Sequence, residues 1–131
     1  MRVAIAALLT ILSLSAFASP NCSNPGPKPS AECVTKIDYC KYTSIVVVLS
    51  YRARLDGKSE EAAFARPSAN DPAWYARNPD VVKDIVHQMY TTDFFQKLRT
   101  RIQPTVLGQA QAIDALTRGC LADTKVVVES H

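Results

Sequence analysis

The longest stretch of helical periodicity in the chain spans residues 32–55, where apolar side chains recur every three or four positions. The predicted buried face consists of Val34, Ile37, Cys40, Val47, Val48, Tyr51 and Leu55, with Ser44 as a small polar member. Ser30 can cap the start of this helix, and Asp56-Gly57 can end it. Residues 45–49 are apolar all round, which indicates a helix covered by neighbours on several sides.

Weaker signals follow this helix. Ser59 is a candidate cap for a short helix over residues 60–66, which we expect to end before Pro67. Residues 68–78 are predicted to form a loop with one helical turn, opened by Asp71-Pro72.

The clearest amphipathic pattern begins at Asn78-Pro79, an Asn cap followed by Pro at the first helical position. Its apolar face is Val82, Ile85, Val86 and Met89. Residues 91–93 can cap the next helix, which we expect to reach Pro104 with Phe95, Leu98 and Ile102 on one face.

A last helix is predicted over residues 105–121, with Gly119 as its terminator. Its expected buried stripe is Val106, Ala110, Ile113, Leu116 and Cys120. The β-branched residues of 44–51 also suit a strand, but the helical period continues on both sides of them. The predicted fold class is therefore all-α, a single small bundle of four to five helices.

The first residues read as a leader. Arg2 precedes a mostly apolar run that ends in Ala16-Phe17-Ala18, the small-x-small pattern of a signal-peptidase site. We expect a signal peptide over residues 1–18 and a mature chain from Ser19, in the periplasm or secreted. A membrane anchor is the rival interpretation, but the run is short for a span, so no membrane span is expected after cleavage.

Removing 18 of the 131 residues leaves 113, which is enough for one domain with one modest core. We divide this part into an extended Pro-rich arm over residues 19–29, a helical domain over residues 30–123 and a C-terminal tail over residues 124–131. Without Arg2, 14 Lys and Arg face 12 Asp and Glu, so the net charge is weak. The densest basic cluster, Lys97, Arg99 and Arg101, does not share one helix face, and we expect no nucleic-acid partner.

All four cysteines follow the predicted cleavage site: Cys22, Cys33, Cys40 and Cys120. An even number in an exported chain favours two disulfides. Cys33 and Cys40 stand about 10 Å apart along one helix, beyond the reach of a bridge. Cys22 therefore pairs with either Cys33 or Cys40, and Cys120 takes the remaining one. A zinc site is disfavoured because the chain has no Cys-x-x-Cys pair.

No catalytic motif is present in the sequence. Asp84 precedes His87 by three residues, so the two could form a dyad on one helix face, but no nucleophile is placed beside them. Both fall on the polar face of their helix, which favours an exposed pair. We expect no enzymatic activity, no cofactor and no metal site.

Trp74 and Tyr75 are the aromatic residues that stand apart from the helical patterns, in a polar loop flanked by prolines. Exposed aromatics of this kind often anchor a partner protein. The alternative is a lid over the core. We therefore consider both residues as candidate binding residues.

Four pieces of the chain resemble a loose group of small exported helical proteins of proteobacteria. They are Cys40, the turn from Arg54 to Ala62 with Gly57 and Ser59, the Ile85-Val86 to Tyr90 helix, and Cys120. The turn is one residue tighter after the serine than in that group. Pairing of the group's two cysteines implies a Cys40–Cys120 bridge, which leaves Cys22–Cys33.

In size, compartment and fold the chain is also similar to periplasmic immunity proteins that block type VI secretion amidase effectors. That likeness carries no residue across. It implies a protein that acts by binding, as an inhibitor or immunity protein for a periplasmic effector, with another protein as its partner. The alternative is a structural or chaperone-like envelope protein without catalytic activity.

Overall fold

The computed structural model describes residues 19–68, 72–126 and 128, which form six α-helices and no strand. The helices are α2 (Ala31–Leu55), α3 (Glu60–Ser68), α4 (Pro72–Arg77), α5 (Pro79–Thr91), α6 (Phe94–Arg99) and α7 (Val106–Ala122). The all-α prediction is confirmed, with one short helix more than expected. The predicted signal peptide, Asp71, residue 127 and the end of the predicted tail, residues 129–131, lie outside the described residues.

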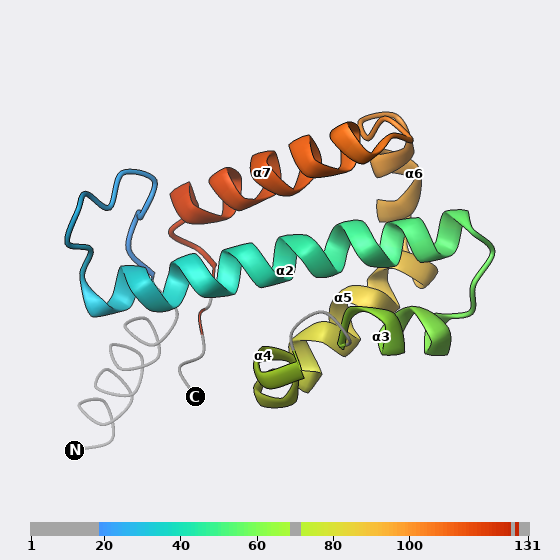
Figure 1. The fold of residues 1–131 in the computed structure, drawn as a ribbon, viewed down its shortest axis with the longest axis horizontal. Coiled ribbons are helices and arrows are strands. Elements are labelled where there is room, and N and C mark those ends of the chain that lie inside the picture. Colours follow the sequence, from blue (N-terminus) through green and yellow to red (C-terminus); the bar gives the residue numbers. More distant parts are fainter. Residues whose placement is uncertain (1–18, 69–71, 127, 129–131) are drawn as a thin grey trace, which may run out of the picture.

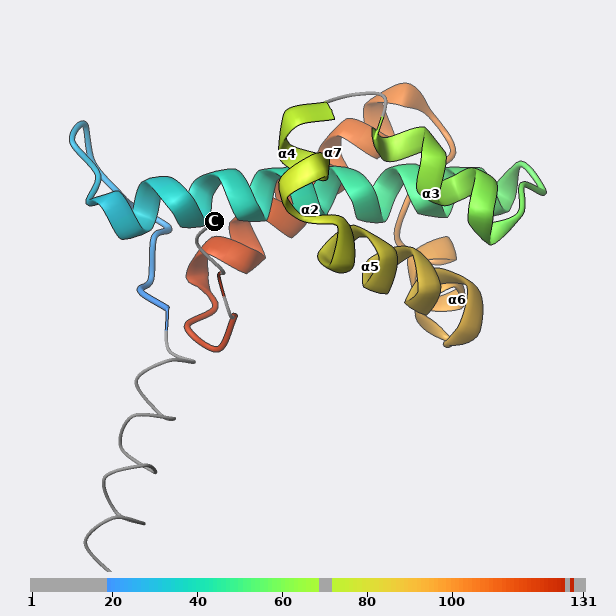
Figure 2. The same cartoon turned by 90° about the horizontal axis from the view of Figure 1, so that it is seen from below.

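Helix α2 runs through the middle of the molecule (Figures 1 and 2). Helix α7 packs along one side of it, and α3 and α5 pack along the other with α4 beside them. Helix α6 lies near the C-terminal end of α2, where the chain passes from α5 towards α7. The prediction that residues 32–55 are covered on several sides is therefore correct.

Both ends of α2 are set by the residues that the sequence indicated. The Ser30 hydroxyl accepts a hydrogen bond from the Cys33 amide at 3.2 Å, which caps the N-terminus. At the other end Gly57 has φ +73°, a left-handed conformation that glycine adopts without steric cost. The Lys58 amide then donates to the Ala53 carbonyl at 2.9 Å, closing the helix end with the pattern of a Schellman motif.

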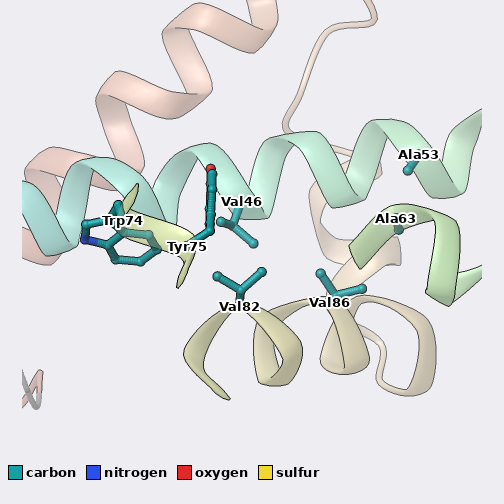
Figure 3. Close-up of a cluster of buried hydrophobic side chains, with 7 residues drawn as sticks. All are labelled: Val46, Ala53, Ala63, Trp74, Tyr75, Val82 and Val86. Carbon is teal, nitrogen blue, oxygen red and sulfur yellow. The ribbon is translucent and has the colours of Figure 1, made fainter. Parts of the chain in front are cut away.

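The core consists of two clusters, both packed against the C-terminal half of α2. The first is drawn in Figure 3 and contains Val46, Ala53, Ala63, Trp74, Tyr75, Val82 and Val86. The second contains Val48, Tyr51, Met89, Phe95, Leu98 and Ile102, with Ile113 and Leu116 of α7 packed against it. The predicted apolar faces of α2, α5 and α6 supply most of these side chains.

Two helix ends differ from the prediction. Helix α3 continues through Pro67 to Ser68, because a proline so near a helix end removes a hydrogen bond from the last turn only. Helix α6 stops at Arg99 instead of reaching Pro104. The Leu98 carbonyl accepts from both the Arg101 and Ile102 amides, at 2.9 and 2.8 Å, so the chain tightens into a turn there.

The start of α7 also differs from the predicted stripe. Val106 is 88% exposed and Leu107 67% exposed, whereas Gly108 is buried. A Cβ at residue 108 would stand 2.5 Å from the Gln103 carbonyl oxygen, so the first turn of α7 fits against the preceding loop only because residue 108 has no side chain. Gly119, the predicted terminator, lies inside α7, which ends at Ala122 with Asp123 as its C-cap.

Both disulfides implied by the resemblance are present and their pairing is confirmed. Cys22 is bonded to Cys33 with an S–S distance of 2.05 Å, and Cys40 to Cys120 with 2.04 Å. The first bridge fixes the arm to the first turn of α2, and the second fixes α7 to the same helix. No described helix is both long enough and apolar enough to cross a membrane.

Candidate functional site

A groove of about 210 Å³ lies between the N-terminal half of α2 and the end of α4. Helix α2 contributes Val34, Thr35, Asp38 and Tyr39, and the opposite wall is Trp74, Arg77 and Asn78. Val34 was predicted to be buried, yet it is 47% exposed because this part of α2 faces the groove. The groove therefore combines an aliphatic patch, aromatic rings and two opposite charges.

The aromatic wall is fixed by packing. Trp74 and Tyr75 are each 5% exposed and lie in α4, so the expected exposed loop is wrong and the lid over the core is correct. The Trp74 ring lies 5.1 Å from the Tyr42 ring, tilted by 30°, and 5.4 Å from the Tyr75 ring, nearly perpendicular to it. These are favourable aromatic geometries, and they hold the indole at the edge of the groove. A binding role for the two residues stays a prediction, and in this geometry Trp74, not Tyr75, lines the groove.

Asn78 holds the end of α4 in place. It was predicted to cap α5 through its side chain, but its amide group instead donates to the Trp74 carbonyl at 2.9 Å. Asn78 is 8% exposed, so this bond is shielded from water. Because the backbone amide of Asn78 also donates to the Trp74 carbonyl at 3.1 Å, one residue fixes the helix end that carries both Trp74 and Arg77.

The charges of the groove stand at its rim. Asp38 on α2 and Arg77 on α4 are both exposed and line opposite walls. Such a pair can orient a polar group while the rings and Val34 contact apolar surface. The volume lies below the range of about 300–1,000 Å³ typical of small-molecule and cofactor pockets, and it suits one or two inserted side chains.

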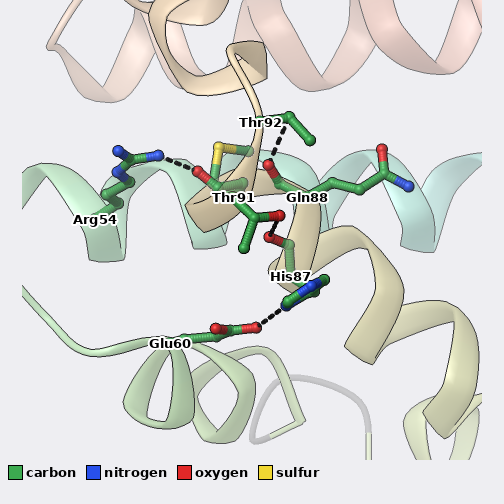
Figure 4. A network of polar contacts seen from close by, with 7 residues as sticks. Arg54, Glu60, His87, Gln88, Thr91 and Thr92 are labelled. Carbon is green, nitrogen blue, oxygen red and sulfur yellow. Dashed lines mark hydrogen bonds and ion pairs between the residues drawn. The ribbon is translucent and has the colours of Figure 1, made fainter.

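The dyad of Asp84 and His87, which the sequence allowed but did not favour, does not form. His87 Nδ1 lies 2.7 Å from Glu60 Oε1 on α3 (Figure 4). The Asp84 carboxylate instead accepts a hydrogen bond from the Gln88 side chain at 2.9 Å. The His87 and Glu60 side chains are 60% and 42% exposed. Asp80 and Lys83 complete a hollow of about 350 Å³ around them.

The arrangement of these polar groups does not resemble a metal centre. Among the described residues, no group of three or more His, Cys, Asp or Glu side chains is placed to hold a metal ion. The Glu60–His87 contact joins α3 to α5 at the surface, and water reaches both partners. Its geometry is that of an exposed surface pair.

Among the groove residues, sequence reasoning proposed only Trp74 as a binding residue, and the members that it missed include Asp38, Arg77 and Asn78. Asp38 and Arg77 look like ordinary surface residues, and only the packing of α4 against α2 brings them to one groove. Asn78 carried a signal, because it precedes a proline, but the signal pointed to a cap rather than to a bond with Trp74.

Comparison with protein-family models, with curated proteins and with solved structures finds no match to this chain.

Proposed function

We propose that this protein is exported and acts by binding another protein through the groove beside Trp74. The observation that carries the proposal is the groove itself, with a rigid aromatic wall, an exposed aliphatic side chain and two opposed charges. Binding hot spots combine these features, because aromatic and Arg side chains supply contact area and orientation together. A wall that is already fixed loses little conformational entropy when a partner docks.

The partner that we propose is a periplasmic effector, which the protein inhibits by occupying its surface. Two features support export and the oxidising compartment. The sequence begins with a leader-like run, and all four cysteines are joined in disulfides, bonds that persist mainly outside the cytosol. Surface binding also agrees with a site too small for a cofactor.

Reversing the charge of Arg77 tests the proposal. Immobilised wild-type protein should capture its partner from periplasmic extract, and Arg77→Glu should weaken the measured affinity at least about tenfold, the size of a modest hot spot. Arg118→Glu is the matched control, because Arg118 is an exposed arginine that pairs with Asp114 on the far helix α7. The affinity of the Arg118→Glu variant for the partner should equal that of the wild type.

Equal binding by Arg77→Glu and the wild type would place the contact surface elsewhere. A captured effector whose activity is unchanged in the complex would contradict inhibition. If no partner is captured and loss of the gene makes the envelope leak periplasmic proteins, the structural envelope role is the correct one.

A further inference from the structure

Three residues on one side of α2 bind the N-terminal arm and the C-terminal end of α7. Cys33 is bonded to Cys22 of the arm, and Cys40 is bonded to Cys120 of α7. Lys36 lies between them at helical spacing and is 0% exposed. Its ammonium donates to the Pro20 carbonyl of the arm and, at 2.7 Å, to the Asp123 carbonyl that follows α7.

The arm covers the Lys36 ammonium and is hydrogen-bonded to the end of α7. The Cys22 amide donates to the Leu121 carbonyl at 2.9 Å, and the Ser19 amide donates to the Thr124 carbonyl at 3.1 Å. The Ser19 hydroxyl also donates to the Asp123 carbonyl at 3.5 Å. The bridge to Cys33 ties the arm covalently to α2 and closes a loop of only 11 positions. Helix α7, in contrast, packs along α2 as well as being bridged to it.

When the arm is closed, burial of the Lys36 ammonium destabilises its charged form. An ammonium group that leaves water loses hydration, which two carbonyl oxygens replace only in part. Burial accordingly lowers the pKa of Lys36, and the nearby Asp123 carboxylate opposes that shift. When the arm lifts, the ammonium regains water, so the disulfide holds the arm against this tendency.

The open form has its own source of stability. Cys33 is the third residue of α2, so its sulfur lies at a helix N-terminus, one turn from Lys36. Both the helix N-terminus and an adjacent ammonium stabilise a thiolate. A stabilised reduced form makes a disulfide easier to reduce. Cys40 is four residues from Lys36 on the other side, but it lies inside the helix, away from the helix N-terminus.

We propose that the Cys22–Cys33 bridge is a redox-controlled latch that closes the arm over Lys36 and releases it when the bridge is reduced. In the opening step an external dithiol gives two electrons and two protons to the bridge and becomes a disulfide. Cys22 and Cys33 become thiols, and the Cys33 thiol then loses its proton to solvent. Oxidation by an external disulfide reverses the step. The latch is separate from the groove and goes beyond the binding function.

The first test titrates the wild-type protein in buffers of reduced and oxidised dithiothreitol. Free thiols are trapped with N-ethylmaleimide, and brief acetylation followed by peptide mass spectrometry reports the accessibility of Lys36. Exposed Lys41, five residues further along α2, is the internal reference. We expect Cys22–Cys33 to open at a dithiol:disulfide ratio at least about tenfold below that for Cys40–Cys120. Lys36 acetylation should rise with the first opening only.

A second test assigns the role of Lys36. Lys36→Met should raise the ratio needed to open Cys22–Cys33 by about tenfold, because both the buried charge and the partner of the thiolate are lost. Lys41→Met is the matched control and should leave that ratio unchanged. If Lys36 had only a structural role, Lys36→Met would change the stability of the protein but not the dithiol:disulfide ratio at which Cys22–Cys33 opens relative to Cys40–Cys120.

A Cys22→Ser, Cys33→Ser variant mimics the open latch. Its residue-22 amide should exchange hydrogen rapidly while the amides of α2 stay protected, and its Lys36 should be acetylated about as fast as Lys41. The proposal is overturned if both bridges open together or Cys40–Cys120 opens first. It is also overturned if Lys36 stays protected in the variant, or if the α2 amides exchange along with residue 22.

Discussion

At the scale of single residues, the contact between His87 and Glu60 is short but exposed to solvent. We predict that His87→Ala changes the free energy of unfolding by no more than about 0.5 kcal/mol, as for an ordinary surface substitution. The two side chains are 60% and 42% exposed, so water can hydrogen-bond to Glu60 when the imidazole is removed. Urea denaturation of the two proteins measures the difference.

Met89→Ala on the same helix is the control for this measurement. Met89 is 0% exposed, and its truncation should cost about 2–5 kcal/mol. A cost above about 1 kcal/mol for His87→Ala would mean that the Glu60 contact holds α3 to α5. It would also reopen the question of a working role for the imidazole.

Lys36 shows what the sequence conveys about a single residue and what it does not. Its place between Cys33 and Cys40 puts it on the face that carries both bridges, but lysine is a poor candidate for burial. Only the folded chain brings the Pro20 and Asp123 carbonyls to its ammonium. These partners are distant in sequence, and backbone carbonyls leave no residue-specific signal. For the same reason Asp38 and Arg77 could not be assigned to one groove.

At the scale of elements, α4 is too short to be stable alone and depends on its two buried rings. We predict that Trp74→Ala costs about 3–5 kcal/mol of unfolding free energy, because the indole packs against Tyr42 and Tyr75 in the first core cluster. Phe64→Ala on α3 is the control and should cost much less, since Phe64 is 37% exposed. Urea unfolding followed by circular dichroism tests both. A small cost for Trp74→Ala would restore the interpretation of an exposed loop.

Helix starts were more predictable than helix ends and faces. Ser30 and Ser59, both predicted caps, each accept a hydrogen bond from a backbone amide three residues later, and a cap of this kind is local chemistry that the sequence displays. Thr105, which was placed one residue inside the last helix, caps that helix in the same way. The end of α3 depends on the free-energy cost of the one hydrogen bond that Pro67 removes, and the end of α6 depends on the Leu98 carbonyl that two amides share. Hydrophobic periodicity contains no information on either. The exposure of Val106 accompanies the close approach of Gly108 to Gln103 in the preceding turn, a contact with the backbone that side-chain periodicity does not display.

At the scale of the whole molecule, the described helices form three layers, with α2 as the middle layer. Helices α7 and α5 meet opposite sides of α2, and the arm joins the end of α7 beside Lys36. The two bridges therefore act at the same end of α2 but on different parts. One ties the arm to the first turn of α2, and the other ties two helices that pack along each other.

The last prediction concerns the loss of each bridge. In the chain-entropy model a bridge stabilises by restricting the unfolded chain, more so for longer loops. Cys40 and Cys120 are 80 positions apart, so Cys40→Ala with Cys120→Ala should cost about 4–5 kcal/mol, close to the whole stability of a marginal domain. Cys22 and Cys33 are 11 apart, and their loss should cost about 3 kcal/mol and mostly loosen the arm. Thermal unfolding by circular dichroism should give a much lower midpoint, or no folded baseline, for the first variant and a cooperative transition for the second. The opposite order would mean that the arm, rather than the packing of α7 on α2, holds the bundle together.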